Sequence, residues 1–298
     1  MAATSPLGAI SAEVSALNDY AAVRYTNIAF LMLMVYDYAI TLDTEVTRIW
    51  TLQWRLPKVL FLINRYVVPP MLIFDGIVPT LYNLPDSLCT FVAKWTTWPT
   101  IISLATVEII LMLRVFAVCG HRQTIRTFLI CLFTCDMIAW LTMSLLIMSK
   151  TIGSSGGSIF PGCLFSAPKY FYAAWIPPVV FESTIILITL YYLSAYQWSK
   201  KVNITLRILA RDSMIYFFFM FSVLLTNLFI ARFGRDFLGS LFIAPSSVIA
   251  CVGAARMMMN ISETSPREVG PPSTYLEDEI EFRDPDFTTT LGDGDPAL

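Results

Sequence analysis

Three acidic residues, Glu108, Asp136 and Glu182, each stand within a long apolar stretch of the chain. A charge in membrane hydrocarbon is costly unless it is paired or hydrated, so such residues usually face the interior of a helix bundle. Carboxyl groups that meet there could bind a cation or relay protons. In the structural alternative, carboxylic acids, some of them protonated, form hydrogen bonds between helices. The sequence favours this alternative, because similar depth does not show that the three side chains meet.

A second polar set joins opposite charges. At about 1.5 Å of helical rise per residue, Asp37, Arg65 and Arg114 lie at similar depth in the half of the predicted bundle that we assign to the cytoplasm. We therefore expect a buried ion pair between Asp37 and either Arg65 or Arg114.

Two cysteines lie in predicted outer loops, Cys89 before the third apolar stretch and Cys163 after the fourth. Disulfides persist on the oxidising side of a membrane, which favours a Cys89–Cys163 bridge over two free thiols. Sequence alone does not determine connectivity.

Motifs typical of enzymes are missing. The only histidine, His121, lies in a loop, and no His, Cys, Asp and Glu have the spacing of metal ligands. The chain also lacks a phosphate-binding glycine loop and a G-x-S-x-G nucleophile motif. We therefore expect no enzymatic activity, metal, cofactor or nucleic-acid partner. Internal repeats, common in transporters, are also not evident.

The elements that must position these residues are membrane spans. Of 298 residues, 56% are hydrophobic and 14% are charged, and the mean hydropathy is +0.64. Crossing the hydrocarbon takes about 20 apolar residues as a helix. Seven stretches qualify: 21–42, 56–82, 98–119, 124–148, 170–198, 214–233 and 238–259. The sequence thus predicts an all-α membrane protein, a seven-helix bundle in a lipid bilayer. Prolines at 69–70, 177–178 and 245 should kink their helices.

Charge divides the chain into three parts. A short N-terminus, 1–20, precedes the predicted transmembrane domain, 21–260. Residues 1–260 carry a net charge of +6, and residues 261–298 carry −8. This last segment is also rich in proline and glycine, so we expect a disordered acidic tail.

Orientation follows from the basic residues. With the N-terminus outside, the inner segments carry ten Lys and Arg and the outer segments carry six. This bias predicts an outer N-terminus and a cytoplasmic C-terminus, in the plasma membrane or another endomembrane.

Two segments, YDYAITLDTEVTRIW (36–50) and KVLFLINRY (58–66), carry a specific pattern of polar and aromatic residues. This pattern resembles the signature of DUF6533, a fungal family of unknown function, at about residues 25–70. LRVFAV (113–118), RDSMIYF (211–217) and RMMMNI (256–261) resemble further elements of that family. The resemblance implies seven spans, and its outer-loop cysteines support the Cys89–Cys163 bridge. It implies no established activity, ligand or partner.

Two interpretations of function remain. A receptor-like sensor, with an extracellular ligand and a cytoplasmic partner, fits the seven spans, the outer bridge and the basic inner loops. The third span lacks an Asp/Glu-Arg-Tyr triplet and the seventh lacks Asn-Pro-x-x-Tyr, so the layout does not extend to a known receptor class. The alternative is a transporter or ion-conducting protein that uses Glu108, Asp136 and Glu182. We favour the receptor-like interpretation.

Overall fold

The computed structural model describes residues 6–118, 122–156, 161–197, 204–235 and 238–264. Within these residues, seven helical stretches are long and apolar enough to cross a membrane, which confirms the predicted all-α seven-helix architecture. They are Leu17–Arg48, Leu56–Ile77, Asp86–Phe116, Gln123–Lys150, Phe171–Ser194, Met214–Phe233 and Leu238–Met259. The acidic tail lies outside the described residues from 265 onward.

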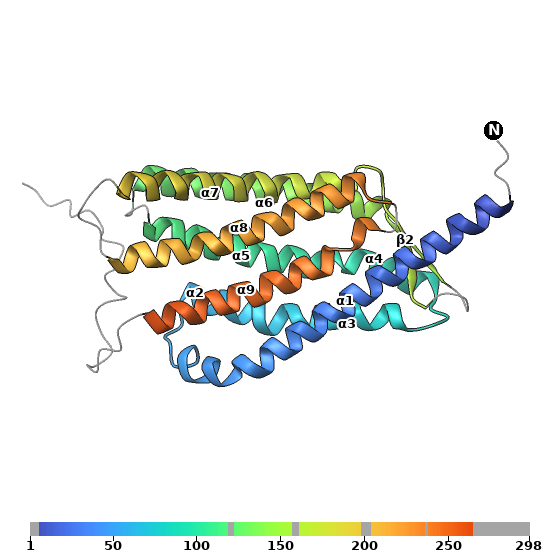
Figure 1. Ribbon diagram of the computed structural model, residues 1–298, viewed down its shortest axis with the longest axis horizontal. Coiled ribbons are helices and arrows are strands. Elements are labelled where there is room, and N and C mark those ends of the chain that lie inside the picture. The colour runs from blue at the N-terminus through green and yellow to red at the C-terminus, as the bar shows by residue number, and fades with distance from the viewer. Residues whose placement is uncertain (1–5, 119–121, 157–160, 198–203, 236–237, 265–298) are drawn as a thin grey trace, which may run out of the picture. The chain divides into compact units, whose positions relative to one another are not determined.

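Figure 1 shows the helices of the bundle running side by side along one axis. The helices are α1 (Pro6–Arg48), α2 (Leu56–Leu62), α3 (Val68–Ile77), α4 (Asp86–Trp95), α5 (Thr97–Val118), α6 (Gln123–Lys150), α7 (Ile176–Gln197), α8 (Ile204–Phe233) and α9 (Ile243–Thr264). Shorter elements are the π-helix η1 (Ile63–Val67), the 3₁₀ turns η2 (Val78–Thr80), η3 (Phe171–Trp175) and η4 (Leu238–Ser240), and the strands β1 (Ile152–Ser155) and β2 (Cys163–Ser166).

The main hydrophobic core follows α5. Leu104, Leu111 and Val115 on this helix are almost fully buried, against Phe181 of α7 and Phe217 of α8. In contrast, α1 packs along α9 and α3 and exposes many large apolar side chains. Exposed apolar surface of this kind suits a helix in contact with lipid, where only the backbone must be satisfied internally.

Proline explains the broken second span. The predicted helix 56–82 is divided by η1, which lies immediately before Pro69 and Pro70. Proline lacks an N–H and clashes with the preceding turn, and a π-helical turn accommodates this clash. The helix then ends at Thr80 rather than at residue 82.

The other prolines with predicted kinks lie at helix starts. Pro177 and Pro178 lie in the first turn of α7, and Pro245 lies in the first turn of α9. The first N–H groups of a helix have no intrahelical acceptor, so proline is tolerated there without a kink. The third span differs in another way, because α4 precedes α5 and begins at Asp86 rather than at residue 98.

A disulfide anchors a small hairpin at one end of the bundle. Cys89 of α4 and Cys163 of β2 are bonded, with their Cα atoms 5.3 Å apart. Strands β1 and β2 are antiparallel, with Ser155 opposite Cys163. A side chain on Gly153 would lie 2.4 Å from the Cys89 carbonyl oxygen, so only glycine lets β1 approach α4 so closely. We call this end the disulfide end, and the opposite end, where α1 stops before Trp50, the Trp50 end.

Candidate functional site

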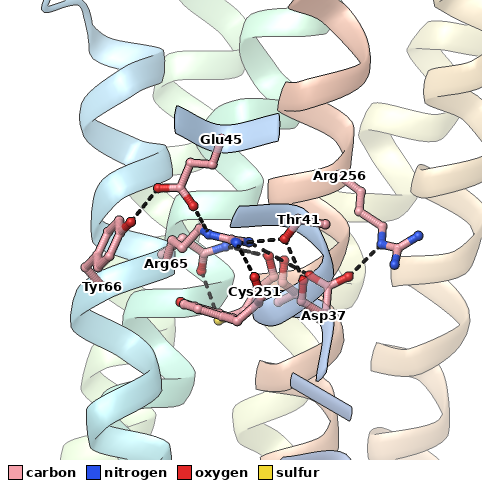
Figure 2. A network of polar contacts seen from close by, with 10 residues as sticks. Asp37, Thr41, Glu45, Arg65, Tyr66, Cys251 and Arg256 are labelled. Carbon is pink, nitrogen blue, oxygen red and sulfur yellow. Dashed lines mark hydrogen bonds and ion pairs between the residues drawn. The ribbon is translucent and has the colours of Figure 1, made fainter. Parts of the chain in front are cut away.

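The first buried polar region, which we call the signature network, centres on Arg65 of η1. Its guanidinium contacts Glu45 of α1 through Nε and lies 3.9 Å from Asp37 Oδ2. It also donates to Thr41 Oγ1 at 2.7 Å. Figure 2 shows Arg65 pointing between Glu45 on one side and Thr41 and Asp37 on the other. The structure thus brings together Asp37 and Arg65, two of the three residues expected to form an ion pair.

The carboxylates of the network have further partners. Glu45 Oε1 accepts hydrogen bonds from Tyr66 Oη at 2.5 Å and from Trp50 Nε1 at 3.1 Å. Asp37 Oδ1 contacts Arg256 Nε of α9 at 2.7 Å. Asp37 and Arg65 are 2% exposed and Glu45 is fully buried, and buried charges require this degree of pairing. The sequence did not predict the pairing of Arg256 with Asp37, which depends on the contact between α1 and α9.

Neighbouring contacts connect this region to the bundle. Asn64 Nδ2 donates to the Cys251 carbonyl oxygen of α9 at 3.3 Å, and Lys58 Nζ donates to the carbonyl oxygens of Trp50 and Leu52 at 3.0 and 2.6 Å. Arg114 donates to the Met257 carbonyl oxygen at 2.9 Å. These bonds join η1 and α5 to α9, and α2 to the segment that follows α1, so the arrangement is suited to holding the helices in register.

The second polar region is the acid cluster, formed by Glu108 of α5, Asp136 of α6 and Glu182 of α7. Glu108 interacts electrostatically with the other two, and Glu182 also interacts with Asp136. Their exposed fractions are 1%, 7% and 1%. The structure therefore brings the three predicted acids together in the interior of the bundle.

The acid cluster lacks the partners that the signature network has. Both carboxylate oxygens of Glu108, Oδ2 of Asp136 and Oε2 of Glu182 are buried without a hydrogen bond to any described residue. Within the described part of the chain, no group of three or more His, Cys, Asp or Glu is arranged to hold a metal ion. Three carboxyl groups in one buried cluster cannot all be ionised, because like charges repel one another. The acid cluster can therefore hold protons.

A cavity of about 220 Å³ opens at the disulfide end. Its wall includes residues of α1, α3, α4, α5, α6, α9, η3 and η4, and β2 contributes Cys163 and Leu164. Trp140 of α6 lines the cavity and stands one helical turn from Asp136, on the same face. The acid cluster therefore lies next to the cavity along α6, although none of its three acids is part of the wall.

Four wall residues have buried polar atoms without a partner among the residues that the structure describes. They are Nε of Arg24, Oδ1 of Asn27, Oδ2 of Asp75 and Nε1 of Trp175. Asp75 is 9% exposed and Trp175 is 4% exposed. The sequence gives no signal that these four residues form a group, because they come from three elements that only the packing brings together. A lone acid in an apolar helix was the one available signal, for Asp75.

The fold and these regions define the class of protein, an integral multi-pass α-helical membrane protein. Residues 25–70 match the sequence model of DUF6533, a family of unknown function. This match confirms the family resemblance, and it covers Asp37, Glu45 and Arg65 of the signature network. No curated protein matches the chain.

Proposed function

We propose that this protein is a receptor-like membrane sensor, a binding and signalling protein rather than an enzyme, whose recognition site is the cavity at the disulfide end. The observation that carries the proposal is the cavity itself, whose apolar wall contains a few buried polar atoms without partners. Ligand sites are typically concave and mostly apolar, with a few polar groups that orient the ligand. The disulfide-anchored β2 forms part of this wall.

The proposal includes an orientation. The disulfide end faces the outside or the lumen, as the basic residues and the oxidised cysteines both favour. A ligand then arrives at the disulfide end, and a cytoplasmic partner would bind at the Trp50 end. The plasma membrane and an endomembrane are both compatible with this orientation.

Filling the cavity tests the proposal. Ser144 of α6 lines the cavity and is 4% exposed, so Ser144→Phe should occupy part of it. Ser149→Phe, at an exposed position of the same helix, is the matched control. A panel of neutral, anionic, cationic and zwitterionic fragments should contain compounds that raise the Tm of the wild type and of Ser149→Phe but not of Ser144→Phe. A panel without such a compound would contradict the proposal.

Transport is a second candidate, which the unpartnered carboxyl oxygens of the acid cluster favour. Buried acids without partners are typical of proton pathways in membranes. Proton flux into reconstituted vesicles tests this function in the wild type and in the triple variant Glu108→Gln, Asp136→Asn and Glu182→Gln. Proton flux in the wild type that the triple variant abolishes would favour the transporter function over the sensor function. Absence of proton flux in the wild type would exclude the transporter function.

A further inference from the structure

The polar atoms of the cavity wall differ in chemical character. Asp75 presents an acceptor, Oδ2, while its Oδ1 accepts a hydrogen bond from Thr96 at 3.4 Å. Arg24 and Trp175 present donors, Nε and Nε1. Buried polar groups without partners are costly. A ligand that matched them would therefore gain more than one that filled the cavity with apolar atoms alone.

The acid and the guanidinium stand at different depths. Gly76, next to Asp75, faces Leu31 of α1 so closely that a side chain on it would lie 2.0 Å from Leu31 Cδ1. Arg24 precedes Leu31 by two helical turns, so Asp75 and Arg24 are separated by about 10 Å along the axis of α1. Among the ion pairs of the described residues, none joins Arg24 to Asp75.

Much of the remaining wall is apolar and aromatic. Trp140, Phe171 and Ile147 line the cavity together with Leu72 and Ile101. Such a surface accommodates a hydrocarbon segment, and indole faces also attract an ammonium group. The cavity wall therefore offers a negative group and a positive group at different depths, together with an apolar surface.

We propose that the ligand of this cavity is a small zwitterionic amphiphile. Its protonated amine would bind Asp75, its apolar body would lie against the aromatic wall, and its acidic group would face Arg24. Trp175 would donate to any further acceptor on the ligand. This inference rests on the proposed sensor function and names the ligand class of the same site. A soluble ω-amino acid derivative has both charges at this spacing, and an ethanolamine lipid headgroup has the same two charges at a shorter spacing.

The test uses 8-aminooctanoate, whose charged ends are about 10 Å apart when extended, together with octylamine and octanoate. Each of the latter lacks one charged end. The full chain is purified in detergent and its Tm is followed by tryptophan fluorescence. At saturation 8-aminooctanoate should raise the Tm by about 2 °C or more, and by more than either analogue.

Variants assign each end of the probe. Asp75→Asn should remove the advantage of 8-aminooctanoate over octanoate, and Arg24→Gln should remove its advantage over octylamine. Asp86→Asn and Arg235→Gln are matched controls, because both residues lie outside the cavity wall. Asp75→Glu keeps the charge and should retain part of the Tm shift with 8-aminooctanoate. This variant therefore distinguishes loss of ligand binding from loss of folding.

The outcomes distinguish the two proposals. Equal shifts with all three probes, or an unchanged response in Asp75→Asn, would overturn the ligand class. The sensor proposal would still stand if other fragments distinguished wild type from Ser144→Phe. If no fragment did so, both would fail.

Nanodiscs identify the source of the ligand. A response to 8-aminooctanoate in phosphatidylglycerol discs but not in phosphatidylethanolamine discs would mean that the lipid headgroup already fills the site. A response in both kinds of disc would assign the site to a soluble molecule. A response in neither would overturn the inference.

Discussion

The signature network and the acid cluster are both buried, yet their carboxylates differ in how many hydrogen-bond and ion-pair partners they have. Asp37 and Glu45 each contact a guanidinium, and Glu45 also accepts from Tyr66 and Trp50. Glu108, equally buried, has no hydrogen bond to either oxygen within the described part of the chain. The paired charges of the signature network fix the positions of their helices. The unpartnered carboxyl groups of the acid cluster can still bind a proton or a polar group. The family match at 25–70 covers Asp37, Glu45 and Arg65 of the network and none of the acid cluster, so the recognisable motif marks the architecture of this bundle.

The largest effect should follow from Arg65→Met. This change leaves Asp37 and Glu45 without their shared guanidinium, and breaking a buried pair in this way costs about 3–5 kcal/mol. The Tm of the purified protein should fall accordingly. Arg235→Gln is the control, since Arg235 pairs with Asp19 but its side chain is 65% exposed, and such pairs contribute about 0–1 kcal/mol. Equal losses in the two variants would show that the network does not hold the helices together.

The disulfide should come next. The double variant Cys89→Ser and Cys163→Ser opens a crosslink between residues 74 apart, which should lower the free energy of unfolding by about 2–4 kcal/mol. Cys131→Ser, at an exposed free thiol, should change little. Because β2 forms part of the cavity wall, the double variant should also lose the fragment responses that distinguish wild type from Ser144→Phe. Retention of those responses would mean that the wall does not need the bridge.

A smaller loss is expected for Lys58→Met. The Lys58 ammonium donates to two carbonyl oxygens beyond the end of α1, those of Trp50 and Leu52. Losing these bonds should cost about 1–2 kcal/mol of unfolding free energy, measured by thermal or denaturant unfolding. Lys169→Met, at an exposed position, serves as the comparison and should be near neutral.

Much of the bundle follows from segment length. Apolar runs near 20 residues predict the spans, and equal helical depth brings Asp37 and Arg65 to one level. The place of Pro177, Pro178 and Pro245 in the first turn of their helices was not predictable in the same way, because segment length does not fix where a helix begins. The short turns η3 and η4 come before α7 and α9. They have no apolar periodicity, so the sequence does not show that the α-helices begin just before their prolines.

The cavity was beyond sequence reasoning for a related reason. Arg24, Asp75 and Trp175 lie on segments far apart in the chain, and helix packing alone brings them to one wall. Arg256 joins Asp37 in the same way, through the contact between α1 and α9. Single residues with unremarkable local sequence give no signal for such contacts.

The most direct test of the contrast is the Tm of Glu45→Gln beside that of Glu108→Gln. Both changes neutralise a side chain that is at most 1% exposed. Glu45→Gln should lower stability by about 2 kcal/mol or more, because Arg65 loses its carboxylate, while Glu108→Gln should leave the Tm unchanged or raise it. A comparable loss in Glu108→Gln would show that the acid cluster is as fully engaged as the network, which would contradict the account.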